Sequence, residues 1–133
     1  MDSFYFMYER LDVWKFSMDF VKEIYELLET FPSDEKYSLV SQIRRSAISV
    51  PSNIAEGSGR MSIKEKIHFI DIATGSLYEA ICQLNIALQV GYVQEDNYDN
   101  IKNQATRIAM MLGGWRRSLS SRETGNKKEN NNE

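Results

Sequence analysis

The chain has 133 residues, 42% of them hydrophobic, and a formal net charge of −3. This length fits a single domain that buries its own core without disulfide or metal support. The single cysteine, Cys82, excludes an intrachain disulfide framework and suits a reducing compartment, so we expect a cytoplasmic protein. Because no apolar run approaches the roughly 18 residues that a membrane span needs, no membrane contact is predicted.

The charges are unevenly distributed along the chain. Residues 1–35 contain nine acidic and three basic residues, whereas residues 36–117 contain seven acidic and ten basic residues. A dedicated nucleic-acid-binding domain is much more basic than this. The pattern still allows a local basic patch, or the pairing of acidic and basic surfaces between two subunits.

Residues 1–10 form an N-terminal arm rich in aromatic side chains, and the first predicted helix covers residues 11–31. Apolar side chains in that helix recur at spacings of three and four, which is typical of an amphipathic helix. The helix is expected to end before Pro32, because the residue that precedes a proline avoids the helical region. Ser33 or Asp34 is then the predicted N-cap of a second helix.

The stretch "QIRRSAISVPSNIAEGSGR", residues 42–60, contains a proline and yet sorts cleanly on a helical wheel. One side is an apolar core row, a second side collects Ile48, Pro51 and Ala55, and the third side is polar. We therefore predict one helix through Pro51, kinked there because proline removes a backbone hydrogen bond and clashes one turn back. The polar side consists of Gln42, Arg45, Ser49, Ser52, Asn53, Glu56 and Arg60.

"SIKE", residues 62–65, predicts a capping box at the start of a third helix, which ends near Gly91. A fourth helix is predicted from Glu95 onward, with one apolar row whose spacings alternate between three and four. That row contains Tyr98, Ile101, Ala105, Ile108, Leu112, Trp115 and Leu119. Residues 120–133 are polar and are predicted to form a disordered tail. Short connections favour antiparallel neighbours, so the predicted fold class is an all-α, up-down-up-down four-helix bundle over residues 11–119.

The second helix has more apolar surface than a monomeric bundle needs, and the arm adds several exposed aromatic residues. Such surplus apolar surface is typical of contacts between subunits, so a homo-oligomer is predicted. The predicted subunit interface consists of Arg45, Ile48, Ser49, Pro51, Ser52, Asn53, Ala55 and Glu56.

Four segments, "LDVWKFSMDFVKEIYELLETFP", "SLVSQIRRSAISVPSNIAEGSGR", "FIDIATGSLYEAICQLNIALQVGYV" and "MLGGWRRSL", resemble a known bacterial family. It is the four-helix-bundle family of proteins encoded in intervening sequences of 23S ribosomal RNA genes. The resemblance covers about residues 11–119 and implies a bundle that assembles as a barrel-shaped cyclic homopentamer. A more distant resemblance, to the accessory protein of diversity-generating retroelements, implies binding of nucleic acid and of a reverse transcriptase. That accessory protein is basic, whereas this chain is net acidic.

Basic side chains around the second helix and on the fourth are candidate contacts to phosphate groups. Arg60 lies one turn after Glu56 and can pair with it, while Arg116 and Arg117 are expected in a last helical turn, where cations complement the helix dipole. No aromatic platform accompanies these residues, so stacking of single-stranded bases is not predicted. The candidate nucleic-acid contacts are Arg44, Arg45, Arg60, Lys64, Lys66, Arg107, Arg116 and Arg117.

No arrangement of residues in the sequence predicts an enzyme. A serine nucleophile needs a base within hydrogen-bond reach, and the single histidine, His68, lies in a different helix from the serines of residues 42–60. "EKIH", residues 65–68, matches half of a di-iron motif, which one histidine per subunit cannot complete. We expect His68 and Asp71 to form a solvated polar face and Cys82 to be a small packing residue. No catalytic residue, metal or cofactor is predicted.

Two functions agree with the sequence. The first is a non-enzymatic, oligomeric accessory protein associated with RNA or DNA and encoded in or near a ribosomal RNA intervening sequence. It rests on the resemblance and on the arginine groups. The alternative is a protein scaffold or adaptor without nucleic-acid binding, whose partner is a reverse transcriptase or another bundle. This reading rests on the surplus apolar stripe and on the acidic first helix.

Overall fold

We describe a computed structural model of the chain, which places the backbone of residues 5–131 and the side chains of residues 5–125. These residues contain four α-helices and no strand, which confirms the all-α fold class. The helices are α1 (Asp12–Leu28), α2 (Leu39–Ser58), α3 (Ile63–Gln89) and α4 (Glu95–Asn131). Two short 3₁₀ helices, η1 (Met7–Arg10) and η2 (Ser33–Glu35), precede α1 and α2.

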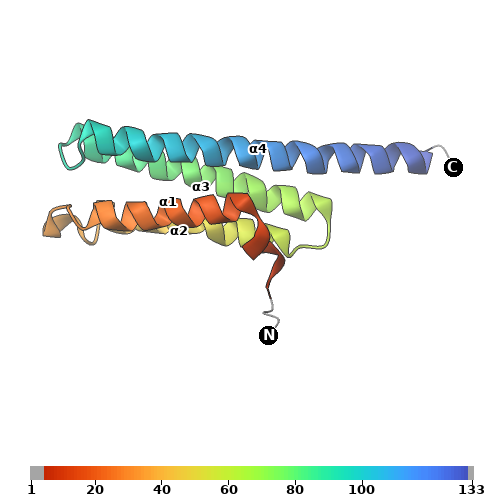
Figure 1. Ribbon diagram of the computed structural model, residues 1–133, viewed down its shortest axis with the longest axis horizontal. Coiled ribbons are helices and arrows are strands. Elements are labelled where there is room, and N and C mark those ends of the chain that lie inside the picture. The colour runs from red at the N-terminus through yellow and green to blue at the C-terminus, as the bar shows by residue number, and fades with distance from the viewer. Residues whose placement is uncertain (1–4, 132–133) are drawn as a thin grey trace.

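The four helices pack as a ring in which each helix touches two others. α1 contacts α2 and α4, and α3 contacts the same two helices from the other side, with α2 and α3 forming the most extensive pair. In Figure 1 the chain passes back and forth along the long axis, α1 and α3 in one direction and α2 and α4 in the other. The short connections leave little freedom for any other arrangement of consecutive helices.

The stretch 42–60 is helical through Pro51 as far as Ser58, as its helical wheel predicts, and its last two residues follow the helix. The kink predicted at Pro51 stays a prediction. The expected N-cap was wrong, because Ser33 and Asp34 lie in η2 and α2 begins only at Leu39. Glu35 supplies the cap instead: its Oε2 accepts hydrogen bonds from the Ser38 hydroxyl at 2.6 Å and from the Leu39 backbone N–H at 3.4 Å.

Both ends of α3 follow the predicted signals. The Ser62 hydroxyl oxygen accepts the Glu65 backbone N–H at 3.1 Å, which caps the first turn. At the other end Gly91 has a φ of +89°, and the Tyr92 N–H reaches back to the Ala87 carbonyl at 2.9 Å. This is a Schellman turn, in which glycine takes the left-handed conformation that side chains disfavour.

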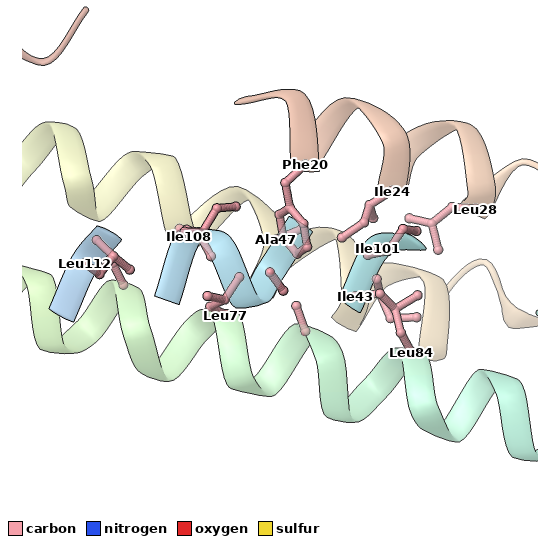
Figure 2. Packing of buried hydrophobic residues seen from close by; sticks show 14 of the residues in the cluster. Phe20, Ile24, Leu28, Ile43, Ala47, Leu77, Leu84, Ile101, Ile108 and Leu112 are labelled. Carbon is pink, nitrogen blue, oxygen red and sulfur yellow. The ribbon is translucent and has the colours of Figure 1, made fainter. Parts of the chain in front are cut away.

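The core lies along the axis of the bundle and receives side chains from all four helices. Figure 2 shows Phe20 and Ile24 from α1, Ile43 from α2, Leu84 from α3 and Ile108 from α4 pointing into this common core. The predicted apolar row of α4 is confirmed, since six of its seven members are buried and Trp115 is partly buried. On α3 the buried row also contains three alanines, Ala73, Ala80 and Ala87.

α4 continues as helix past Leu119, the last buried apolar residue of the bundle, to Asn131. In Figure 1 this end of α4 extends beyond the other three helices. Residues 120–122, 124 and 125 are exposed. The disorder predicted for residues 120–133 and the division of the chain into arm, bundle and tail stay predictions.

Candidate functional site

The polar side of α2 divides into a part that faces α3 and a part that faces outward. The Ser49 and Ser76 hydroxyls lie 2.8 Å apart across the two helices, and Asn53 Nδ2 donates to the Ser49 backbone carbonyl at 2.8 Å. Pro51 is buried within the chain. Ser49, Pro51 and Asn53, three members of the predicted subunit interface, are therefore engaged or buried inside the protomer, and the Ser49–Ser76 contact joins α2 to α3.

The outward part of α2 carries the other predicted interface residues. Arg45, Ile48, Ser52 and Glu56 are exposed, and Ala55 is partly buried. Ile48, with 40% of its surface exposed, is the large apolar residue of this group. That a second subunit covers this surface stays a prediction.

Three of the candidate phosphate contacts are engaged with side chains of other helices. The Arg44 guanidinium lies 5.2 Å from the ring centroid of Tyr25, and Arg107 lies 5.1 Å from that of Phe16. Arg116 Nε donates to Asp71 Oδ1 at 2.8 Å and its Nη2 donates to Oδ2 at 3.2 Å. The hydrogen bond to Asp71 raises the pKa of Arg116.

The prediction that Arg116 and Arg117 lie in a last helical turn was wrong. Both residues lie in the interior of α4, which runs on to Asn131, so neither sits in the last helical turn. Arg116 instead joins α4 to α3, and its partner Asp71 is a residue that the sequence placed on a solvated face. Arg45, Lys64 and Arg117 have no hydrogen-bond or ion-pair partner among the side chains of residues 5–125.

Two candidate basic residues lie together at the turn between α2 and α3. Arg60 and Lys64 line one open hollow of about 490 Å³ together with Glu65, His68 and Phe69. Arg60 also pairs with Glu56, as its spacing predicts, and lies 4.7 Å from the Phe69 ring centroid. Lys66 Nζ donates a hydrogen bond to the Ser58 backbone carbonyl at 2.9 Å and so caps the C-terminal end of α2. The eight candidate residues do not form one continuous patch.

An apolar groove of about 580 Å³ lies between α3 and α4 and is called here the α3–α4 groove. Tyr78 and Met110 rise from its two sides with 65% and 71% of their surface exposed, and Lys102 is its single charged lining residue. The groove is lined by Leu77, Tyr78, Ile81, Cys82, Lys102, Ala105, Thr106, Ala109 and Met110.

The sequence reading missed this groove. Cys82 was expected to be a packing residue, but it is exposed and lies in the groove lining. A signal was present, because Tyr78, Cys82 and Ile86 recur at spacings of four and all three are exposed. Such a row predicts a second apolar face on α3, next to the face that fills the core.

The part of the chain that the structure describes contains no group of three or more histidine, cysteine, aspartate or glutamate side chains placed to hold a metal ion. No helix within it combines the length and the apolarity that crossing a membrane requires.

Comparisons with known proteins agree with the helical architecture. Residues 9–114 match the family described as 23S rRNA-intervening sequence protein. A crystal structure of a protein of unknown function from the S23 ribosomal protein family of Bacteroides thetaiotaomicron is 26% identical, with a TM-score of 0.73. The match covers 78% of this chain and 97% of that one. No curated protein matches the chain.

The family match covers most of the bundle, because it begins at Glu9 in the arm and ends at Gly114, near the middle of α4. The chain therefore belongs to the 23S rRNA-intervening sequence protein family.

Proposed function

We propose that the chain is a non-enzymatic, cytoplasmic scaffold that associates with copies of itself and uses the α3–α4 groove as its principal contact surface. The proposal rests on the groove. Its lining is apolar apart from Lys102 and the Thr106 and Tyr78 hydroxyls, and the Tyr78 and Met110 side chains at its sides are exposed. A contiguous exposed apolar surface on a small domain marks a protein contact. A pentamer is the assembly that the family resemblance implies.

The surroundings of the basic residues also favour protein contacts over nucleic acid. Five of the eight candidate phosphate contacts, Arg44, Arg60, Lys66, Arg107 and Arg116, have an intramolecular partner. A guanidinium that already holds a carboxylate must give up that contact before it binds a phosphate, which lowers the gain in affinity. The chain is net acidic as well, so its overall field does not attract a polyanion.

The molar mass in solution tests the proposed function. Size-exclusion chromatography with multi-angle light scattering at micromolar concentration is expected to give a multiple of the 15.4 kDa protomer mass. Met110→Asp places a charge in the groove and is expected to shift the protein toward the protomer mass. Tyr37→Asp is the matched control, since Tyr37 is 88% exposed in the connection between α1 and α2. A monomeric wild-type protein would contradict self-association.

Association with nucleic acid is the second candidate. The hollow at the turn between α2 and α3 favours it, since the two basic side chains Arg60 and Lys64 meet there, beside the acidic Glu65. The family name refers to a 23S rRNA intervening sequence, and the solved relative belongs to a family named for a ribosomal protein. Both names fit an RNA partner, and a reverse transcriptase is the protein partner that the more distant resemblance implies.

Salt-dependent binding separates this candidate from the scaffold. Fluorescence anisotropy with a single-stranded RNA and a DNA duplex would be measured between 50 and 200 mM salt, where each phosphate contact contributes a slope of about 0.7 to 0.9 in a log–log plot. Lys64→Ala is expected to weaken binding and to reduce that slope by about one contact. Lys15→Ala, an exposed lysine on α1, serves as the control. Absence of binding at 50 mM salt would rule the second candidate out.

A further inference from the structure

The N-terminal arm presents apolar side chains that its own protomer does not cover. Tyr5, Phe6 and Met7 are 60%, 73% and 68% exposed. The arm is nevertheless ordered, because Phe6 stacks on Tyr8 with ring centroids 5.9 Å apart and Tyr8 meets Trp14 edge-on at 5.0 Å. A hydrogen bond of 2.8 Å from the Phe6 N–H to the Glu9 carboxylate fixes the start of η1. Exposed aromatic side chains held in one conformation lose little entropy when they dock.

The α3–α4 groove has the chemistry that an aromatic segment requires. The Met110 thioether can contact the edge of an aromatic ring, and the Lys102 ammonium can lie over a ring face. Tyr78 and Ile81 supply apolar walls, and Cys82 also belongs to the lining. Beside Phe6 the arm carries Glu9, whose charge is opposite to that of Lys102, and Arg10, which lies over the Tyr5 ring with its guanidinium 5.8 Å from the ring centroid.

The arm and the groove lie on different sides of the same protomer. η1 contacts α1 and α2, and in Figure 1 the red segment that precedes α1 lies on the side of the bundle away from α4. A residue adds at most about 3.6 Å of reach, and the arm is packed against α1 and α2 at Tyr8, so its apolar tip cannot cross the bundle to its own groove.

We propose that the aromatic arm of one protomer inserts Phe6, flanked by Tyr5 and Met7, into the α3–α4 groove of a second copy. This inference rests on the proposed function and names the occupant of the groove. Because the arm and the groove are different surfaces, the contact is head-to-tail: every copy donates one arm and accepts another. Such contacts close into a ring when the rotation between neighbours allows it and otherwise extend as a filament.

The single cysteine of the chain makes the contact directly testable. Phe6→Cys adds one thiol on the arm, and Cys82 supplies the other in the groove. Mild oxidation with diamide, which takes up the two electrons and two protons that the thiols lose, is expected to link copies through residues 6 and 82. Because every chain then carries one donor and one acceptor thiol, a non-reducing gel is expected to show a ladder that extends beyond the dimer.

Two control variants show whether the ladder comes from disulfides between residues 6 and 82. Tyr37→Cys places a thiol in the connection between α1 and α2, where Tyr37 is even more exposed than Phe6, and it is expected to form no ladder. Adding Cys82→Ser to Phe6→Cys is expected to abolish the ladder. A dimer that persists in this double variant would show that arms meet arms, which would overturn the proposal.

A second measurement covers the case in which Phe6→Cys itself weakens the contact. In the assembled wild-type protein Cys82 is expected to react with a maleimide at least tenfold more slowly than in Phe6→Asp, in which the charged arm leaves the groove. Equal rates in a protein that light scattering finds to be oligomeric would overturn the arm contact and leave the scaffold function standing. A monomeric wild-type protein would overturn both.

Discussion

The Ser46 hydroxyl on α2 donates a 2.7 Å hydrogen bond to the side-chain oxygen of Gln83 on α3, and both side chains are buried. The Gln83 amide nitrogen in turn donates to Glu79 Oε1 at 3.2 Å, toward the edge of the interface. A buried polar pair of this kind fixes the register of two helices, because a shift of one turn would leave both groups without partners.

Ser46→Ala is expected to lower the free energy of unfolding by about 1–3 kcal/mol, since the Gln83 oxygen would stay buried without a donor. Urea denaturation followed by circular dichroism measures this change. Ser52→Ala is the matched control, because its hydroxyl is exposed and bonds only to the Ile48 carbonyl of its own helix. The control is expected to stay within about 0.5 kcal/mol of wild type. Equal effects of the two variants would contradict the role assigned to Ser46.

Gly57→Ala is expected to destabilise the protein although alanine is the better helix former. A Cβ at position 57 would lie 2.9 Å from the Phe69 Cβ and 3.4 Å from the Lys66 carbonyl oxygen, so α2 and α3 would have to separate. Overpacking of this kind costs about 1–3 kcal/mol, which exceeds the gain of about 1 kcal/mol in helix propensity.

Gly75→Ala on α3 is the matched comparison, because nothing lies within 4 Å of its Cβ position. This variant is expected to stabilise the protein by about 0.5–1 kcal/mol. Thermal unfolding of both variants under one set of conditions gives the comparison. A shift of the thermal unfolding midpoint in the same direction for both variants would contradict the clash predicted for a Cβ at position 57.

Tyr92→Phe is expected to destabilise the protein in a pH-dependent way. The Tyr92 hydroxyl donates to Glu35 Oε1 at 3.0 Å and so joins the turn after α3 to the segment before α2. Hydrogen bonds from Ser38 and from Tyr92 lower the pKa of Glu35, and the hydrogen bond to Glu35 raises the pKa of Tyr92.

The direction of each pKa shift sets the pH range of the effect. Glu35 has a lowered pKa in the folded state, so its contribution is present at neutral pH and is lost as the pH falls through that value. Tyr92 has a raised pKa, so its contribution is present below the unfolded value and is lost as the pH rises through the folded one. The difference between wild type and Tyr92→Phe is therefore expected to narrow below about pH 4 and above about pH 10. Denaturant titrations across this range test it, with Tyr37→Phe at an exposed position as control.

Truncation tests the boundary that the sequence places after Leu119. Removal of residues 124–133 is expected to change the free energy of unfolding by less than about 0.5 kcal/mol, because the side chains of residues 124 and 125 are exposed. Removal of residues 119–133 also deletes the buried Leu119 side chain and is expected to cost about 2–5 kcal/mol. Similar losses in both truncations would show that residues beyond Leu119 contribute to the bundle.

The sequence by itself determined the features that depend on neighbours along the chain. The periodic row of α4, the Ser62 cap of α3 and the turn at Gly91 all follow from residues a few positions apart, and the structure confirms each of them. The helix through Pro51 was also predictable, because the apolar residues on both sides of the proline continue one helical face.

The tertiary structure alone decided which side chains meet across helices. The pairing of Arg116 with Asp71, the cap that Glu35 gives to α2 and the exposure of Cys82 in the α3–α4 groove depend on the rotation and register of packed helices. Periodicity shows that a helix has an apolar face, but it does not show how far packing against two neighbours covers that face. α3 carries apolar side chains on more of its surface than α2 and α4 cover, and some of those left uncovered, such as Tyr78 and Cys82, line the groove.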